Sequence, residues 1–225
     1  DGRYVEQAKI QAGKKFKILE ISKKLPYQIL NSRLNLGFDP TVFTSRSLIY
    51  FFRNKIKLTP ITKIIVNSEI LKDHTSRKFY SLNPKVVGET VNSKIKRLIQ
   101  ILKKDRSDCI FISAPENVAW LLNIRGRDNP FSPIPNCKII INNKGEISFF
   151  SDIKKSSNIF KKKSSLKISF YKENQIENFL GRLKSKKIVI DKNSCPVLLE
   201  NLINSKFKIS EFTIILVIGV SLILF

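Results

Sequence analysis

The clearest periodic pattern in the chain lies in its second half. Apolar residues there follow one another at intervals of four, three, one and three residues, which places them on one face of a helix. This spacing predicts a helix over residues 89–104. The stripe consists of Val91, Ile95, Leu98, Ile99 and Leu102. The apolar run Cys109–Ser113 predicts a buried strand. Pro115 predicts the first turn of a further helix, a position that proline tolerates well.

Two more strands are predicted on either side of a tight-turn sequence. They cover residues 137–141 and 146–150, and Asn142-Asn143-Lys144-Gly145 between them is typical of a hairpin. The remaining elements predicted in this half are strands over 166–171 and 187–191 and a helix over 196–203. Alternating strands and helices predict an α/β architecture, and the hairpin makes a mixed sheet the expected kind.

The first third of the chain also alternates between helical and strand patterns. Its predicted elements, in order, are a helix over 4–12, a strand over 15–21, the start of a helix over 26–30, a strand over 33–39, an amphipathic stretch over 41–57 and a short strand over 61–66. Residues 71–87 show weak periodicity and contain Pro84, so we interpret them as a linker between two domains. The Lys- and Ser-rich stretch 154–165 is predicted to be a surface loop or an exposed helix.

The two ends of the sequence suggest a piece of a longer product. The chain contains no Met and begins with Asp1. Its last segment, Phe212–Phe225, carries no charge, and a helix of that length would span about 21 Å, against about 30 Å for a bilayer core. Three interpretations of this segment stay open: a frameshifted or artefactual terminus, which we favour, a buried strand–turn–strand, and a membrane tail.

The charge of the chain is strongly positive. There are 41 Lys and Arg against 18 Asp and Glu, a net charge of +23 in 225 residues. Such a field suggests nucleic acid or an anionic membrane. Lys outnumbers Arg, however, and lies along the whole chain beside many Ile, Asn and Phe, as codon bias in an AT-rich genome produces. We therefore expect a solvated basic surface and no specific nucleic acid or membrane partner, with polyanion binding as the alternative.

Few residues in the chain are suited to catalysis. Cys109, Cys137 and Cys195 are far apart and form no C-x-x-C pair, which fits a reducing compartment and buried thiols. His74 is the one histidine and lies in the predicted linker. The sequence also lacks the motifs of serine hydrolases, phosphate-binding loops and zinc peptidases. We therefore assign no catalytic and no metal-binding residue.

One segment, Ser113–Pro135, carries more specific information. It reads as an apolar helix containing Trp120, followed by Asn-x-Arg-Gly, an Asp and a Pro-rich connection into a strand. We expect Gly126 to provide a positive φ at the helix C-terminus and Arg125 to complement the helix dipole.

This segment resembles the middle domain of the aminopeptidase P (Xaa-Pro aminopeptidase) family, in the creatinase/prolidase superfamily. That domain carries a similar A-W-L-L-N-x-R-G-x-D-x-x-x-x-P signature. Three further matches precede this segment in the chain and occur in the same order as in the family. They are Asp1-Gly2-Arg3-Tyr4, Leu36-Gly37-Phe38-Asp39-Pro40, and Gly88-Glu89 with Lys94. Together they cover about residues 1–205. The family's Trp and Arg-Pro in the linker have no counterpart here.

The resemblance implies a fold of two creatinase N-terminal-like domains, each a mixed sheet flanked by helices. The domain limits it implies are 1–70 for the C-terminal part of the first domain, 71–87 for the linker, 88–208 for the second domain and 209–225 for the hydrophobic tail. It also implies that the family's catalytic domain is missing. That domain binds two divalent metals, usually manganese, through two Asp, one His and two Glu, none of which has a counterpart here.

The expected function is that of a non-catalytic N-terminal region, inactive alone. The full-length enzyme would be cytoplasmic and homo-oligomeric and would release the residue that precedes Pro at a peptide's N-terminus. Asn123, Arg125 and Asp128 are the residues we expect to contact the substrate or the missing domain. The alternative is a standalone, non-enzymatic module of the same fold that binds a protein partner or a polyanion.

Overall fold

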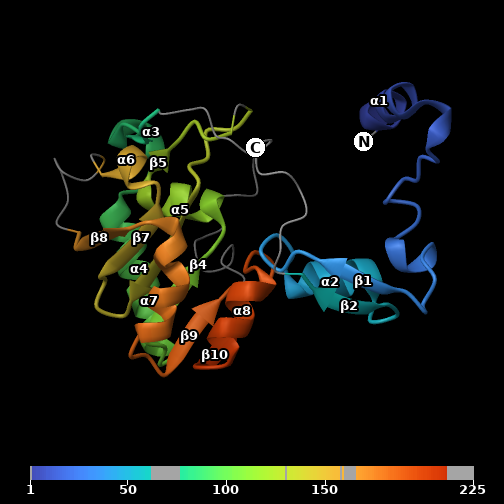
Figure 1. Ribbon diagram of the computed structural model, residues 1–225. Coiled ribbons are helices and arrows are strands. Elements are labelled where there is room, and N and C mark those ends of the chain that lie inside the picture. Colours follow the sequence, from blue (N-terminus) through green and yellow to red (C-terminus); the bar gives the residue numbers. More distant parts are fainter. Residues whose placement is uncertain (1, 62–76, 130, 158, 160–165, 212–225) are drawn as a thin grey trace.

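The computed structural model describes residues 2–61, 77–129, 131–157, 159 and 166–211. The described residues of 77–211 fold around one six-stranded sheet with strand order β10-β9-β4-β6-β7-β8 (Figure 1). Its strands are β4 (Cys109–Ile112), β6 (Cys137–Asn142), β7 (Ile147–Ser151), β8 (Ile168–Tyr171), β9 (Lys187–Ile190) and β10 (Lys208–Glu211). The pairs β4–β6 and β6–β7 are antiparallel, and the other neighbours are parallel. The predicted mixed sheet is therefore confirmed.

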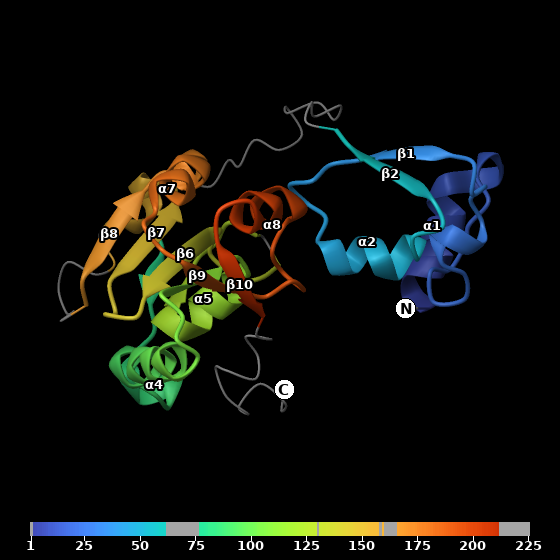
Figure 2. The same cartoon turned by 90° about the horizontal axis from the view of Figure 1, so that it is seen from below.

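Helices cover both faces of this sheet. The helices on one face are α4 (Val91–Lys104) and α5 (Pro115–Leu122), and those on the other are α7 (Ile176–Arg182) and α8 (Val197–Asn204) (Figure 2). The strands between them alternate at period two. In β4, Ile110 and Ile112 pack with the α4 and α5 side, whereas Cys109 and Phe111 pack with the α7 and α8 side. Burial on both faces explains why this strand is a continuous apolar run.

Short elements join the ends of these layers. They are α3 (Pro84–Val87), α6 (Ile153–Ser156), and the antiparallel pair of β3 (Tyr80–Ser81) and β5 (Ile124–Arg125). Within the range predicted as a linker, Phe79 is buried in the core of the sheet region, and its backbone N–H donates to the carbonyl of Lys155. Residues 71–76 of that range lie outside the described residues.

The first 61 residues form a smaller unit. Here α1 (Gly2–Ala12) and two 3-10 helices (Gly13–Lys15 and Pro26–Gln28) precede β1 (Asn35–Phe38), α2 (Ser45–Phe52) and β2 (Lys57–Pro60). The strands β1 and β2 pair in parallel and form a sheet of two strands.

This unit contacts the larger sheet region through α8. The backbone N–H groups of Val197 and Leu198 donate to the carbonyls of Phe43 and Pro40, both at 2.9 Å. The side chain of Val197 joins the apolar cluster of α2 and β1. An exposed ion pair of 3.2 Å links Arg46 of α2 to Glu211 of β10.

One prediction for the first third is wrong, and the predicted amphipathic stretch is helical only in part. No strand forms over 15–21, where a 3-10 helix ends at Lys15 and irregular backbone follows. Of the apolar residues in that range, Phe16, Leu19 and Ile21 are exposed and Ile18 is only half-buried, so the segment lacks the buried face that would stabilise a strand. The amphipathic stretch 41–57 forms a helix only to Phe52, because Arg53 and Asn54 take positive φ values, and β2 begins at Lys57. Of the strand predicted over 61–66, residues 62–66 lie outside the described residues.

The Lys- and Ser-rich stretch also differs from its prediction where it is described. Lys155 and Ser156 lie in α6 and are buried, whereas Lys154 beside them is exposed, so this end of the stretch is only partly solvated. Residues 160–165 and the tail Phe212–Phe225 lie outside the described part of the chain. None of the helices formed by the described residues is both long enough and apolar enough to cross a bilayer.

Candidate functional site

The C-terminal end of α5 gathers most of the polar residues that the sequence singled out. Asn123 follows the helix with a φ of 52°, a left-handed conformation that Asn tolerates better than most residues. Its side-chain Oδ1 accepts a hydrogen bond from Lys94 Nζ at 2.7 Å, and its Nδ2 donates to the carbonyl of Glu89 at 3.0 Å. Asn123 therefore ends α5 and fastens that end to the start of α4.

Lys94 occupies the centre of this arrangement. Only 3% of the residue is exposed, and its Nζ donates to the carbonyl of Trp120 at 2.6 Å as well as to Asn123. The same Nζ lies 3.8 Å from the centre of the Trp120 ring, within cation–π range. Burial lowers the pKa of Lys94 from 10.5 to about 8, because removal from water disfavours the charged form.

The nearby carboxylate of Glu89 serves a different partner. Its two oxygens accept hydrogen bonds from the guanidinium of Arg97 at 2.7 and 3.1 Å, and Ser93 Oγ donates to it at 2.8 Å. The hydrogen bond from Arg97 is the main cause of the lowered pKa of Glu89. The buried ammonium of Lys94 is thus held by a carbonyl, an amide oxygen and an aromatic ring.

Arg125 also serves the C-terminal end of α5. Its Nη1 donates to the carbonyls of Ala119 and Ile124 at 3.1 and 2.8 Å. A cation at these carbonyls complements the negative end of the helix dipole, as the sequence predicted.

Asp128 belongs to a separate ion pair. Its Oδ1 accepts a hydrogen bond from Lys155 Nζ at 2.7 Å, and its Oδ2 accepts one from the backbone N–H of Asn136 at 2.6 Å. The two charged side chains are only 9% and 10% exposed. This pair fixes the loop after β5 to α6, which lies 27 residues further along the chain.

Gly126 is required for a different reason from the one predicted. It is absent from the residues with positive φ, a role that Asn123 fills instead. A Cβ at Gly126 would lie 2.6 Å from the Cα of Pro135, closer than atoms can approach. The glycine thus allows the backbone after β5 to lie in contact with the backbone at Pro135, just before β6.

Each of the three predicted site residues therefore makes internal hydrogen bonds with a different partner: Asn123 with Lys94, Arg125 with the carbonyls of Ala119 and Ile124, and Asp128 with Lys155. Sequence reasoning assigned no role to Lys155. The sequence signal available for it, a Lys-Ser run, points to a solvated surface, and a partner 27 residues away leaves no local pattern.

The described residues do not fit a pair of divalent metals. They contain no group of three or more His, Cys, Asp or Glu side chains that could hold a metal ion, and His74 lies outside them. The three cysteines are free and buried. Burial raises the pKa of Cys109 to about 11 and that of Cys195 to about 12, and it also raises the pKa of Cys137. Thiols of this kind are poor nucleophiles at neutral pH.

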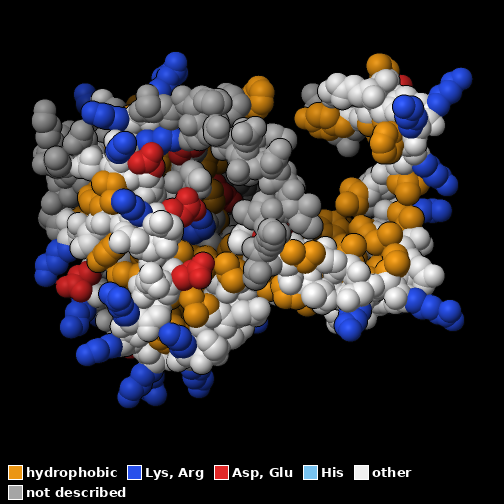
Figure 3. All heavy atoms as spheres, in the orientation of Figure 1, with side chains coloured by type: hydrophobic (Ala, Val, Ile, Leu, Met, Phe, Trp, Pro, Cys, Tyr) orange, Lys and Arg blue, Asp and Glu red, His pale blue; other side chains and the backbone are white. Residues whose placement is uncertain are grey.

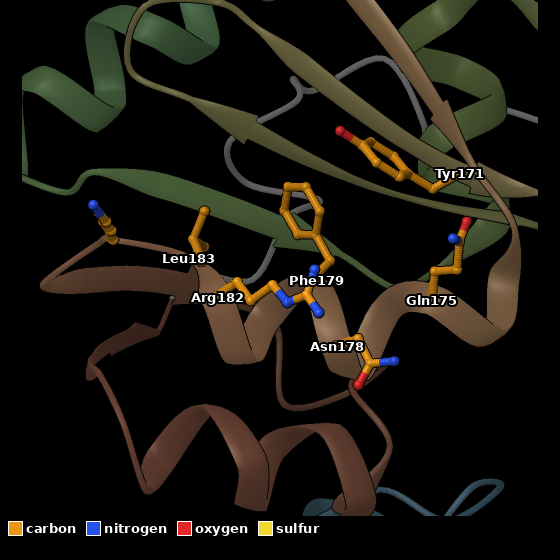
Figure 4. A pocket seen from close by; sticks show the side chains of 7 residues that line it. Tyr171, Gln175, Asn178, Phe179, Arg182 and Leu183 are labelled. Carbon is orange, nitrogen blue, oxygen red and sulfur yellow. The ribbon is translucent and has the colours of Figure 1, made fainter.

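An open cavity lies beside α7, away from the residues at the end of α5 (Figure 4). This open cavity of about 530 Å³ is lined by Tyr171 and Phe179, whose ring centres are 5.1 Å apart, and by Arg182 and Lys184. Gln175, Asn178 and Leu183 complete its lining. This mixture of aromatic, amide and cationic side chains suits the binding of a small molecule.

Comparison with known proteins identifies the family of the chain. A model of the creatinase/prolidase N-terminal domain matches residues 72–217. A probable Xaa-Pro aminopeptidase P of Fusarium vanettenii is 29% identical over 149 residues, and Xaa-Pro aminopeptidase 1 of Dictyostelium discoideum is 26% identical over 134 residues. These matches cover 60% and 59% of this chain but only 24% and 21% of the relatives. The chain thus spans about a quarter of the length of the curated relatives it matches.

A solved structure shares the fold over nearly the whole chain. The X-prolyl aminopeptidase of Caenorhabditis elegans, described as a cytosolic enzyme with a di-nuclear active site, superposes with a TM-score of 0.70 at 20% sequence identity. The superposition covers 95% of this chain and 38% of the worm enzyme. At this identity the likeness shows the fold alone, whereas the family model matches more than half of the chain. The chain therefore belongs to the creatinase/prolidase N-terminal domain family.

Proposed function

We propose that this chain is the non-catalytic N-terminal region of a metal-dependent Xaa-Pro aminopeptidase. The observation that carries the proposal is the match of an N-terminal domain model to a chain that spans about a quarter of its Xaa-Pro aminopeptidase relatives. The full-length enzyme would remove the residue that precedes Pro at the N-terminus of a peptide. Two divalent metals, with manganese as the expected ion, would act in a catalytic domain outside this chain, by activating water and polarising the peptide carbonyl.

The same proposal covers the organisation of the chain. Residues 1–70 would be the C-terminal part of a first creatinase-like domain, 71–87 a linker, 88–208 the second domain and 209–225 a tail. Phe79 and residues 209–211 of β10 pack with the sheet region, so these parts of the linker and tail ranges would belong to the second domain. The surface of the first unit supports this division. Among the described residues, eleven of the fourteen large hydrophobic side chains that are exposed lie between Tyr4 and Ile61. Figure 3 shows such side chains gathered on this part of the molecule. A two-stranded sheet with so much exposed apolar surface is marginal by itself.

Asn123, Arg125 and Asp128 would then act indirectly. We propose that they fix the end of α5 and the following loop in the shape that contacts the catalytic domain or the substrate. We further propose that the complete enzyme is a cytoplasmic homo-oligomer. No step of the peptidase reaction is assigned to the residues of this chain.

Two assays test the proposal. The purified chain, supplied with Mn²⁺ and the peptide Arg-Pro-Pro, should release no arginine above the protein-free control. Release of arginine that EDTA suppresses would contradict the proposal.

The second assay uses the native protein. Antibodies against residues 77–211 should precipitate, from the cells that make it, a product more than twice as large as the 25.9 kDa of this chain. The precipitate should cleave Arg-Pro-Pro in an EDTA-sensitive manner. An inactive precipitate of about the mass of this chain would favour the alternative of a standalone binding module.

A further inference from the structure

A small cavity on the α4 side of the sheet combines an apolar floor with a cationic rim. Its volume is about 330 Å³, which lies at the lower end of the range for small-molecule sites. Ile95 and Ile99 of α4 and Leu166, just before β8, provide the apolar lining. Ile95 is buried and the other two are half-buried, so the floor is part of the packed core.

The rim carries three lysines from three different parts of the fold. Lys96 comes from α4, Lys144 from the turn between β6 and β7, and Lys167 from the approach to β8. No acidic side chain is among the described residues that line the cavity. Lys167 lies 3.9 Å from Glu146, but these side chains are 81% and 50% exposed, so water screens that pair.

The turn that carries Lys144 is fixed against α4. Asn142 Oδ1 accepts hydrogen bonds from the backbone N–H groups of Lys144 and Glu146, at 3.0 and 2.9 Å. Gly145 has a φ of 85°, and a Cβ there would lie 2.9 Å from Ile99 Cδ1. The turn therefore packs directly on the helix, and the rim and the floor belong to one preformed site.

We propose that this cavity binds a small amphipathic phosphate ester. Its phosphate would lie among Lys96, Lys144 and Lys167, and its hydrocarbon would rest on the apolar floor. Lysine ammonium groups bind phosphate as point charges, and the lining residues that the structure describes include no planar guanidinium.

The phosphate ester could be soluble or could be the headgroup of a membrane lipid. Both sources offer the same group, a phosphate dianion joined to an alkyl chain. The probes that separate them are monobutyl phosphate in solution and vesicles of phosphatidylcholine with or without phosphatidic acid.

The experiment measures binding of each probe to the full chain by calorimetry in phosphate-free buffer. Backbone amide shifts at residues 96, 144, 145 and 167 locate the site. Monobutyl phosphate should bind more tightly than inorganic phosphate, because the floor holds its alkyl chain. The variant K96Q/K144Q/K167Q should bind it at least about tenfold more weakly, since three favourable charge interactions are lost.

A matched variant separates a site from general charge. K14Q/K24Q/K57Q also loses three exposed lysines, all in the first 61 residues, and should bind monobutyl phosphate within about threefold of the wild type. Equal weakening in both triple variants, or no weakening in the cavity variant, would overturn the proposal. Binding to phosphatidic acid vesicles that the cavity variant loses would identify a lipid as the source. Binding of monobutyl phosphate without vesicle binding would identify a soluble ester.

Discussion

The buried ammonium of Lys94 is the residue-level feature with the clearest physical consequence. Among the described residues no carboxylate accepts a hydrogen bond from it, and a carbonyl, an amide oxygen and the Trp120 ring hold it in place. Charged groups near it act in opposite directions, since Glu89 raises its pKa while Arg125 and Arg97 lower it. Burial dominates, so the charged form is disfavoured in the folded chain.

The pH dependence of stability tests this description of Lys94. Its pKa is about 8 when folded and 10.5 when unfolded, so between these values the unfolded chain binds one more proton. The Lys94 contribution to the free energy of unfolding therefore increases as the pH rises through that window. Urea unfolding at several pH values from 8 to 10 gives the free energy of unfolding at each pH. Plotted against pH, this free energy should rise more steeply for the wild type than for Lys94→Met. The buried cysteines, whose pKa values are raised, contribute a pH dependence of opposite sign, but they are present in both proteins and cancel in the comparison. Parallel pH dependences in the two proteins would refute the lowered pKa of Lys94.

The ion pair of Asp128 and Lys155 supports a second prediction at this scale. Asp128→Asn should lower the free energy of unfolding by about 2–3 kcal/mol, because a buried ammonium loses its carboxylate. The double variant Asp128→Asn, Lys155→Met should recover most of that loss. Glu146→Gln, in the exposed pair with Lys167, should change stability by less than about 0.5 kcal/mol. An Asp128→Asn effect as small as that of Glu146→Gln would contradict a structural role for the pair.

At the scale of elements, the turn between β6 and β7 tests how closely hairpin and helix pack. Gly145→Ala should destabilise the chain by about 2–3 kcal/mol, because it adds backbone strain at a φ of 85° and a clash with Ile99 Cδ1. In an Ile99→Val background, which removes that Cδ1 atom, the same substitution should cost only about 1 kcal/mol. Equal costs in the two backgrounds would show that the helix does not constrain the turn.

Elements with strong local patterns were predictable from sequence. The apolar stripe from Val91 to Leu102 became α4, and the Asn-Asn-Lys-Gly turn joined two antiparallel strands. The strand predicted over 15–21 does not form, because an alternation at period two gives a strand only where one face is buried. Phe16 in this segment is 70% exposed. The helix α7 was missed because its two buried residues, Ile176 and Leu180, are too few to show a period.

The polar contacts of the candidate site were less predictable than the elements that carry them. The sequence motif drew attention to Asn123, Arg125 and Asp128, but their partners lie far along the chain. Lys94 is 29 residues from Asn123, and Lys155 is 27 residues from Asp128. Tertiary packing brings these groups together, and packing of that kind has no local signature. Gly126 shows the same limit, since its neighbour Pro135 is close only in the folded chain.

At the scale of the whole molecule, two units of unequal completeness meet at α8. Among the described residues, the larger has a six-stranded sheet with helices on both faces, and the smaller has two strands and most of the exposed large hydrophobic side chains. Together with the family match over residues 72–217, this inequality supports the central claim that the chain is the N-terminal region of an Xaa-Pro aminopeptidase.

Sequencing the transcript well beyond both ends of this chain tests that claim most directly. The account predicts an open reading frame that continues for several hundred residues past the creatinase-like region. That continuation should encode, in order, two Asp, one His and two Glu as ligands for a pair of metals. A verified stop codon directly after Phe225 would contradict the account and would favour a standalone binding module.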